Sequence, residues 1–302
     1  MTGYLHTKYA ESLAELGFPR LLPKSQGWIL ERKIPGFPYQ DAIGCYPLFA
    51  CKDWNMVCED LESIDNELVS LAVVTDPFGN YEVEDLNQCF NHKVIPFKEH
   101  FIVDLTSPLD TFISSHHRRY IRKALQDVQV EKCQDPMQSI LDWIELYNVL
   151  IERHNIRGIS AFSQQSFINQ LQVPGLFMFR AVHQEVTVGI NLWYVHSNVG
   201  YYHLGAYSDL GYQLRASFAL FWSAIEYFSD IKLRWLNLGA GAGLKGTETD
   251  GLSRFKEGWS TGTRTAYFCC HIFDPRKYTQ IMNEKDIPAT EYFPAYRKGE
   301  FK

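Results

Sequence analysis

The segment from residue 176 to residue 239 constrains the fold most strongly, because its hydrophobic period changes from two to about 3.6 partway along. Residues 186–195 alternate between apolar and smaller or polar side chains, and short turns join them to strand-like runs at 176–182 and 200–207. From Tyr212 to Phe228 the apolar residues recur at helical spacing, and residues 233–239 return to a strand pattern. A helical crossover makes this last strand parallel to a neighbour, so the segment predicts a mixed sheet and excludes a doubly wound Rossmann arrangement.

The flanking sequence predicts two parts. Residues 1–105 combine a short helix at 7–16 with strand patterns at 27–34, 41–51, 68–79 and 100–105, and we expect them to form a small α+β unit. Residues 106–302 form the second expected domain. Its further helices are predicted at 114–128, 139–156, 163–171 and 250–259, and its last strand at 265–273.

Composition narrows the function classes. A net charge of −6 and a pI near 5.9 argue against a protein that encloses long nucleic acid, although they permit a local basic pocket. No apolar run approaches the roughly 20 residues that a membrane span needs, and the N-terminus lacks the apolar core of a signal peptide. We therefore expect a cytoplasmic protein. The seven cysteines include no C-x-x-C pair, so we expect reduced thiols and no metal site.

Two basic features suggest anion binding. The helix that follows residues 200–207 begins with amides that lack partners in its own first turn, and Arg215 adds a fixed charge there. The residues predicted to line this site are Gly211, Gln213, Leu214, Arg215, Ala216 and Ser217. The second feature is the polar face of helix 114–128, which carries Arg118, Arg119, Arg122 and Lys123. This face is either a site that binds an anionic acceptor or a solvated surface.

The loop "GAGAGLKG" contains a G-x-G-x-x-G pattern from Gly241 to Gly246. No βαβ unit surrounds it and the helix after it is short, so the pattern does not predict a dinucleotide site. We expect a flexible loop over a substrate instead.

Three antiparallel strands, an amide-rich turn, an alanine-rich helix and a parallel strand resemble the core of the GNAT N-acetyltransferase superfamily. This resemblance implies an α+β fold with a GNAT-like mixed, mostly antiparallel sheet flanked by helices. It also implies that the turn before the helix binds the pyrophosphate of coenzyme A. The corresponding sequence here is "QLRAS", residues 213–217, which lacks the usual glycines.

A narrower resemblance covers roughly residues 105–285. The segments "SSHHRRYIRKAL", "YYHLGAYS" and "DGLSRFKEGWS", in this order, are similar to the Fem-type and cellulose-biosynthesis-type GNAT-like transferases. Such proteins attach an acyl or aminoacyl group to an amine on a sugar or cell-envelope precursor, from acyl-CoA or from aminoacyl-tRNA. Many contain two related domains, which implies that residues 1–105 are a divergent GNAT-like unit.

The resemblance places Lys256, in "RFKEGW", beside the reacting groups; a helix-surface lysine is the alternative. Strand alternation places His203 on the same side as Tyr201, Gly205 and Tyr207, where it could accept the amine proton; a structural histidine is the alternative. The residues expected on the acceptor side are Arg118, Arg119, Tyr207, Asp250 and Arg254.

The expected activity is transfer of an acyl group, acetyl above all, from acyl-CoA to an amine acceptor by direct attack. Acetyl-CoA or another acyl-CoA is then the donor, and the acceptor is a small molecule or an envelope precursor. An aminoacyl-tRNA-dependent transferase on the same fold is one alternative. A GNAT-like binding protein without catalysis is the other.

Overall fold

The computed structural model describes residues 1–64, 67–241 and 251–300. It contains two compact units, each assembled from separate chain segments. Unit 1 consists of Met1–Gly3, Glu99–Ile156 and Ser163–Arg264, and unit 2 of Tyr4–Lys98, Arg157–Phe162 and Thr265–Lys302. The expected division after residue 105 differs from this one in residues 1–3, 99–105, 157–162 and 265–302. The last of these segments belongs to unit 2 because a late strand pairs with β4 there.

The sheet of unit 1 has the strand order β5-β10-β9-β8-β7-β6. Only β9 and β10 are parallel neighbours; the other adjacent pairs are antiparallel. The strands are β5 (Lys93–Asp104), β6 (Gln129–Lys132), β7 (Leu176–His183), β8 (Val186–His196), β9 (Val199–Tyr207) and β10 (Trp235–Gly239). The mixed, mostly antiparallel sheet expected from the sequence is confirmed.

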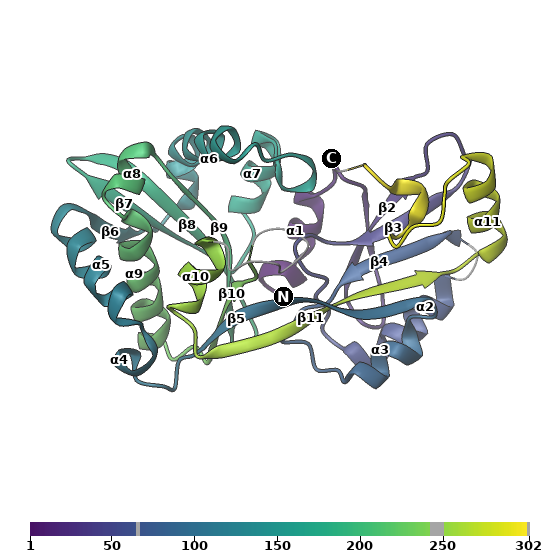
Figure 1. Cartoon of the computed structure of the whole chain (residues 1–302), viewed down its shortest axis with the longest axis horizontal. Helices are drawn as coiled ribbons and strands as arrows, with labels where there is room; N and C mark the ends of the chain where they lie inside the picture. The colour runs from purple at the N-terminus through teal and green to yellow at the C-terminus, as the bar shows by residue number, and fades with distance from the viewer. Residues whose placement is uncertain (65–66, 242–250, 301–302) are drawn as a thin grey trace. The chain divides into compact units, whose positions relative to one another are not determined.

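Helices cover both faces of this sheet. α5 and α9 lie against one face with α10, and α6 and α7 lie against the other (Figure 1). The helices of unit 1 are α4 (Leu109–Phe112), α5 (Ser115–Asp127), α6 (Ile140–His154), α7 (Gln164–Leu171), α8 (Asp209–Gln213), α9 (Ala216–Asp230) and α10 (Gly251–Glu257).

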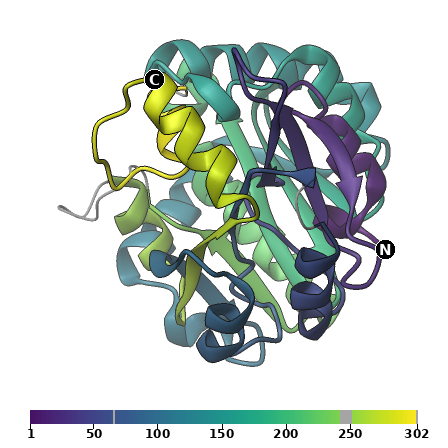
Figure 2. The same cartoon turned by 90° about the vertical axis from the view of Figure 1, so that its right-hand side faces the viewer.

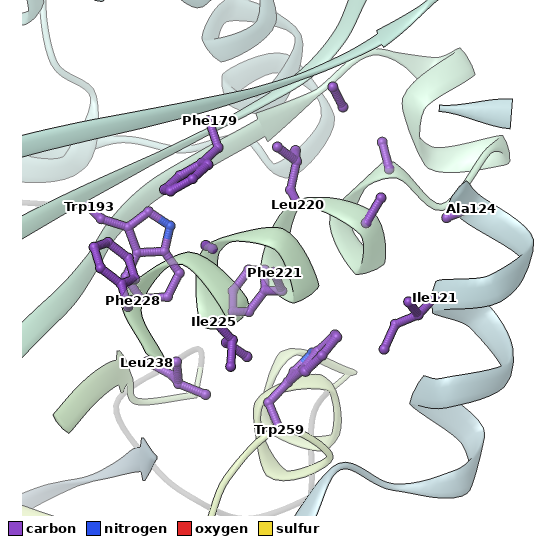
Figure 3. Close-up of a cluster of buried hydrophobic side chains, with 14 of the residues drawn as sticks. Ile121, Ala124, Phe179, Trp193, Leu220, Phe221, Ile225, Phe228, Leu238 and Trp259 are labelled. Carbon is purple, nitrogen blue, oxygen red and sulfur yellow. The ribbon is translucent and has the colours of Figure 1, made fainter. Parts of the chain in front are cut away.

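Helix α9 is the centre of an extensive apolar core in unit 1. Trp193 and Phe179 point from the strands toward α9, while Ile121 of α5 and Trp259 approach it from another side (Figure 3). Phe221, on α9, stacks on Trp259 with ring centroids 5.8 Å apart. This packing follows from the distribution of apolar residues on α9. Because they extend around most of the helix, other elements must cover it on more than one side.

Unit 2 has the strand order β1-β2-β3-β4-β11. Its strands are β1 (Phe18–Leu21), β2 (Trp28–Lys33), β3 (Gln40–Gly44), β4 (Ser70–Val74) and β11 (Gly262–Ile272). Its helices are α1 (Thr7–Ser12), α2 (Val57–Ile64), α3 (Val83–Cys89) and α11 (Pro275–Glu284). Figure 2 shows this unit from the side, with α11 in yellow beside the purple N-terminal strands.

Two features of unit 2 were not expected. Cys58 and Cys89 form a disulfide that joins α2 to α3, so the expectation of reduced thiols is wrong for this pair. Asp41 is fully buried and accepts hydrogen bonds from two buried arginines: from Arg32 at 3.3 Å and from Arg297 at 2.6 and 2.9 Å. This network holds the segment around Arg297 against β2 and β3.

The two units share one topology. In each, three antiparallel strands lead through a helix to a fourth strand that is parallel to the third: β7-β8-β9, α9 and β10 in unit 1, and β1-β2-β3, α2 and β4 in unit 2. In each, an antiparallel strand follows at the next position, β5 beside β10 and β11 beside β4. This common order supports the proposal that unit 2 is a divergent GNAT-like unit.

The helix expected from Tyr212 to Phe228 is two helices in the structure. α8 ends at Gln213 and α9 begins at Ala216, because Arg215 between them adopts a left-handed backbone conformation with φ 59°. No helix among residues 1–64, 67–241 and 251–300 is both long and apolar enough to cross a membrane.

Candidate functional site

The parallel strands β9 and β10 separate toward their C-terminal ends. Their last paired residues are Tyr201 and Asn237. Beyond this point β9 continues to Tyr207 paired with β8, except at His203, and has no β10 partner in the part of the chain that the structure describes. Strands that diverge stop hydrogen-bonding to each other, so backbone groups at their ends can bond a ligand instead.

Lys256 lies at this point of divergence. It is 5% exposed, and its Nζ donates a 2.6 Å hydrogen bond to the carbonyl of Ala240, directly after β10. Its ammonium also lies 5.8 Å from the ring centroid of Tyr202, the first β9 residue beyond the pairing. At Gly239, where φ is +76°, a Cβ atom would stand only 3.1 Å from Nζ. Lys256 is therefore a buried residue at the strand ends, and the alternative of a surface lysine is wrong.

A β-bulge at His203 changes which residues of β9 share a face. Leu192 of β8 pairs with Leu204 while Trp193 pairs with Tyr202, so His203 is the extra residue. The expectation that His203 lies on the side of Gly205 and Tyr207 is wrong for this reason, because simple alternation fails across a bulge.

His203 instead packs on the face covered by α7. Its Nε2 bonds Gln170 Oε1 at 3.0 Å, its ring contacts Tyr194, and burial lowers its pKa to about 3. The structure does not bring His203 together with Lys256, whose neighbour Tyr202 lies on the opposite face with Trp193 and α9.

The predicted anion-binding turn contains the short helix α8 and the junction before α9. The amides of Gly211, Leu214 and Arg215 already donate hydrogen bonds, to Ser208 Oγ, Leu210 and Tyr212 respectively. Gly211 also packs so closely that a Cβ would lie 2.0 Å from a backbone oxygen of β8. The amides available for an anion are therefore those at the first turn of α9, which begins at Ala216.

Two arginines meet beside that first turn. The guanidinium groups of Arg215 and Arg119 lie 4.7 and 5.1 Å from the ring centroid of Tyr120 on α5. Arg119, through a hydrogen bond, and the charge of Arg215 lower the pKa of Tyr120. Neither arginine has a carboxylate partner within residues 1–64, 67–241 and 251–300. Both contact Tyr120, and Arg215 directly precedes α9, whose N-terminus is the positive end of its dipole.

The other predicted residues lie in different settings. Arg118 is exposed and donates to the carbonyl of Asp110 at 3.0 Å, which turns it away from Arg215. Tyr207 is buried and donates to Asn191 Oδ1 at 2.9 Å. Arg254 is an exposed residue of α10. Asp250 lies outside the described residues.

Sequence reasoning missed His117, which fixes α10 relative to α5. Its Nε2 meets the carbonyl of Phe255 at 2.8 Å and its Nδ1 meets Ser114 Oγ at 2.8 Å. A carbonyl can only accept, so Nε2 carries the proton and Nδ1 accepts from the serine. Burial lowers the pKa of His117 and favours this neutral form. Phe255 directly precedes Lys256 in α10, so this hydrogen bond helps to fix the position of Lys256. The motif "SSHH", which contains His117, was the sequence signal that could have indicated this contact.

Comparison with known proteins agrees with this geometry. Residues 114–257 match the acetyltransferase (GNAT) domain family. This segment is a GNAT domain. It contains α5, the strands β7 to β10, the α8–α9 junction and Lys256, so it holds every described part of the site. No curated protein matches the chain by sequence. Among the described residues, no group of three or more His, Cys, Asp or Glu side chains could hold a metal ion.

Solved structures share the fold of the GNAT domain and of the rest of the chain. FemX has a TM-score of 0.64 at 14% identity, with 91% of this chain and 93% of FemX covered. The C-terminal domain of a protein assigned as a lysylphosphatidylglycerol synthetase from Agrobacterium fabrum has a TM-score of 0.61 at 14% identity, covering 92% of this chain and 91% of that one. L-PGS from Bacillus licheniformis has a TM-score of 0.55 at 16% identity, covering 95% and 98%.

Proposed function

We propose that this protein transfers an acyl group, acetyl above all, from acyl-CoA to an amine acceptor, with the reaction in unit 1 between β9 and β10. The observation that carries the proposal is the buried Lys256 at the point where these strands diverge, within a GNAT domain. An ammonium fixed there can stabilise negative charge that develops on the reacting carbonyl or on the acceptor.

Unit 2 has the same strand order but a closed gap. After β3 the chain stays hydrogen-bonded to the end of β4: the Phe49 amide donates to the Val74 carbonyl at 2.7 Å, and the Asp76 amide donates to the Phe49 carbonyl at 3.0 Å. Backbone groups that bond each other leave no space for a pantetheine arm between them. This contrast supports unit 1 as the catalytic unit.

The donor's phosphates would bind at the first turn of α9. Arg215 and Arg119 both lie against Tyr120 without a carboxylate partner in the described chain, and the first amides of a helix favour an anion. An arginine pair can hold phosphate oxygens by charge-assisted hydrogen bonds. The proposal therefore assigns Arg119, which the sequence suggested for the acceptor side, to donor binding instead.

The reaction we propose is a direct attack. The amine nitrogen forms a bond to the thioester carbonyl carbon and loses a proton. The carbon–sulfur bond breaks, and the thiolate leaves with the electron pair and takes up one proton, so the products are an amide and free CoA thiol. Amides of β9 between Leu204 and Ala206 would polarise the carbonyl, and Lys256 would face the developing charge. The acceptor would be a small molecule or an envelope precursor.

An aminoacyl donor is the second candidate. One of the similar structures comes from a protein assigned as a lysylphosphatidylglycerol synthetase, an activity that by its name attaches a lysyl group. An aminoacyl-tRNA would then replace acyl-CoA on the same fold. Lys256 and the strand gap would keep their roles.

A thermal-shift panel tests the donor. A ligand at 100 times its Kd stabilises the folded state by about 2.7 kcal/mol, which raises the Tm of a chain of this size by several degrees. We expect acetyl-CoA to raise Tm in this way. Stabilisation by charged tRNA alone would favour the second candidate, and stabilisation by neither donor would contradict both and leave a GNAT-like protein without catalysis.

A further inference from the structure

Three polar side chains interrupt the apolar core of unit 1 on its α9 face. Asn191 is completely buried and Tyr207 is 8% exposed, and the hydroxyl of Tyr207 donates to Asn191 Oδ1. The hydroxyl of Tyr202 lies in the same cluster, because a Cβ atom at Gly205 would stand 2.2 Å from it and 3.1 Å from the hydroxyl of Tyr207. Asn191 Nδ2 has no partner among the residues that the structure describes. An unpaired buried amide group costs about 1–3 kcal/mol, so this cluster is not explained by stability.

The backbone of β9 is shaped to place the hydroxyl of Tyr202 in this cluster. The bulge at His203 brings Tyr202 and Gly205 to the same face, opposite Trp193 and Asn191 of β8. A Cβ atom at Gly205 would lie 2.2 Å from the hydroxyl of Tyr202 and 2.8 Å from Asn191 Oδ1. Any other residue at 205 would therefore force Tyr202 out of position.

The ring of Tyr202 is held as firmly as its hydroxyl. Its centroid lies 5.2 Å from that of Trp193 and 4.7 Å from that of Phe221, so two core aromatics fix its plane. The ammonium of Lys256 lies 5.8 Å from the same centroid, and its other described contact is the carbonyl of Ala240. The ring quadrupole attracts a cation over its face, more strongly where water is excluded.

We propose that Tyr202 is a positioning residue that holds the Lys256 ammonium between β9 and β10, and that the polar cluster with Tyr207 and Asn191 exists to hold Tyr202. A lysine side chain loses rotamer entropy when it is fixed, and contacts that hold its ammonium offset this loss. The tyrosine ring supplies one such contact. This inference rests on the proposed function for the role of Lys256 in catalysis, but not for its position.

Chemical labelling tests the position without an activity assay. Reductive methylation of Lys256, followed by peptide mass spectrometry, reports how tightly the amine is held. Tyr202→Leu removes the ring, and we expect labelling of Lys256 at least fivefold faster than in the parent. Tyr202→Phe retains the ring and removes the hydroxyl, and should label at a rate between the two. Tyr227→Leu is the matched control, because that tyrosine lies 5.1 Å from the ammonium of Lys132 instead.

Kinetics then test the consequence. A cation–π contact of about 1–2 kcal/mol corresponds to a loss of about 5- to 30-fold in kcat for Tyr202→Leu, with the KM for donor unchanged. Tyr227→Leu should retain the parent kcat. Parental labelling of Lys256 in a folded Tyr202→Leu protein would overturn the inference even if the protein is an active transferase. Faster labelling in a protein without transferase activity would support the position and contradict the proposed function.

Discussion

His203 offers the sharpest test of the strand geometry, because the bulge moves it from the reacting side to the buried face beside α7. Its pKa of about 3 compares with 6.5 in an unfolded chain. Between these values the unfolded state binds the proton and the folded state does not, so the free energy of unfolding falls as pH decreases. From pH 6.5 to pH 4, at about 1.36 kcal/mol per pH unit, His203 alone should lower it by about 3 kcal/mol.

The substitution His203→Gln removes this titration, since glutamine can still bond Gln170 and carries no ionisable group. Urea unfolding at pH 7, 6, 5 and 4 should show a shallower loss of stability in the variant than in the parent. His154→Gln, at an exposed position at the end of α6, is the control and should follow the parent. In a transfer assay the kcat of His203→Gln should stay within about threefold of the parent, whereas loss of a general base costs 10²–10⁴-fold. A parental pH slope, or a 100-fold loss of kcat in a folded variant, would refute the placement of His203.

Three further substitutions test other parts of the structure. Arg215→Glu should weaken acetyl-CoA binding by about 1–3 kcal/mol in calorimetry, while Arg122→Glu, the same charge change on the exposed face of α5, should not; equal losses would point to net charge alone. Lys256→Met should lower kcat and leave the circular dichroism spectrum unchanged, and a parental kcat would remove Lys256 from the reaction. Arg297→Ala leaves the buried Asp41 without its closest partner, so urea unfolding should show a loss of about 3–5 kcal/mol; a loss below 1 kcal/mol would show that the network is dispensable.

The sequence was most informative where local pattern and tertiary structure agree. The three antiparallel strands, the crossover helix and the parallel strand from residue 176 to residue 239 follow from the spacing of apolar residues. Apolar residues at every second position cover one face of a strand, and apolar residues about every 3.6 positions form a stripe along a helix. The N-terminal half was less clear. β1 and α3 are short, and the pairing of β11 with β4 joins residues 194 to 202 positions apart, such as Phe268 with Val74 and Ile272 with Ser70, which no local pattern can indicate.

The candidate site was predicted in outline only. Lys256 was found from its motif, but its burial depends on Ala240 and Tyr202, which lie far from it in the sequence. The position of His203 depends on one extra residue in β9, and a bulge leaves no mark in an alternating sequence. The break between α8 and α9 at Arg215 could not be predicted either, because arginine rarely adopts the left-handed backbone conformation that it has here.

The central claim is that acyl-CoA binds between β9 and β10 of unit 1. Hydrogen exchange of backbone amides, measured by mass spectrometry with and without saturating acetyl-CoA, tests the donor and its location together. We expect protection in residues 202–207 of β9 and at the first turn of α9, and none in the corresponding segment of unit 2, residues 45–51, where the gap is closed. Protection confined to unit 2, or no protection by acetyl-CoA at a concentration that saturates known GNAT enzymes, would contradict the account.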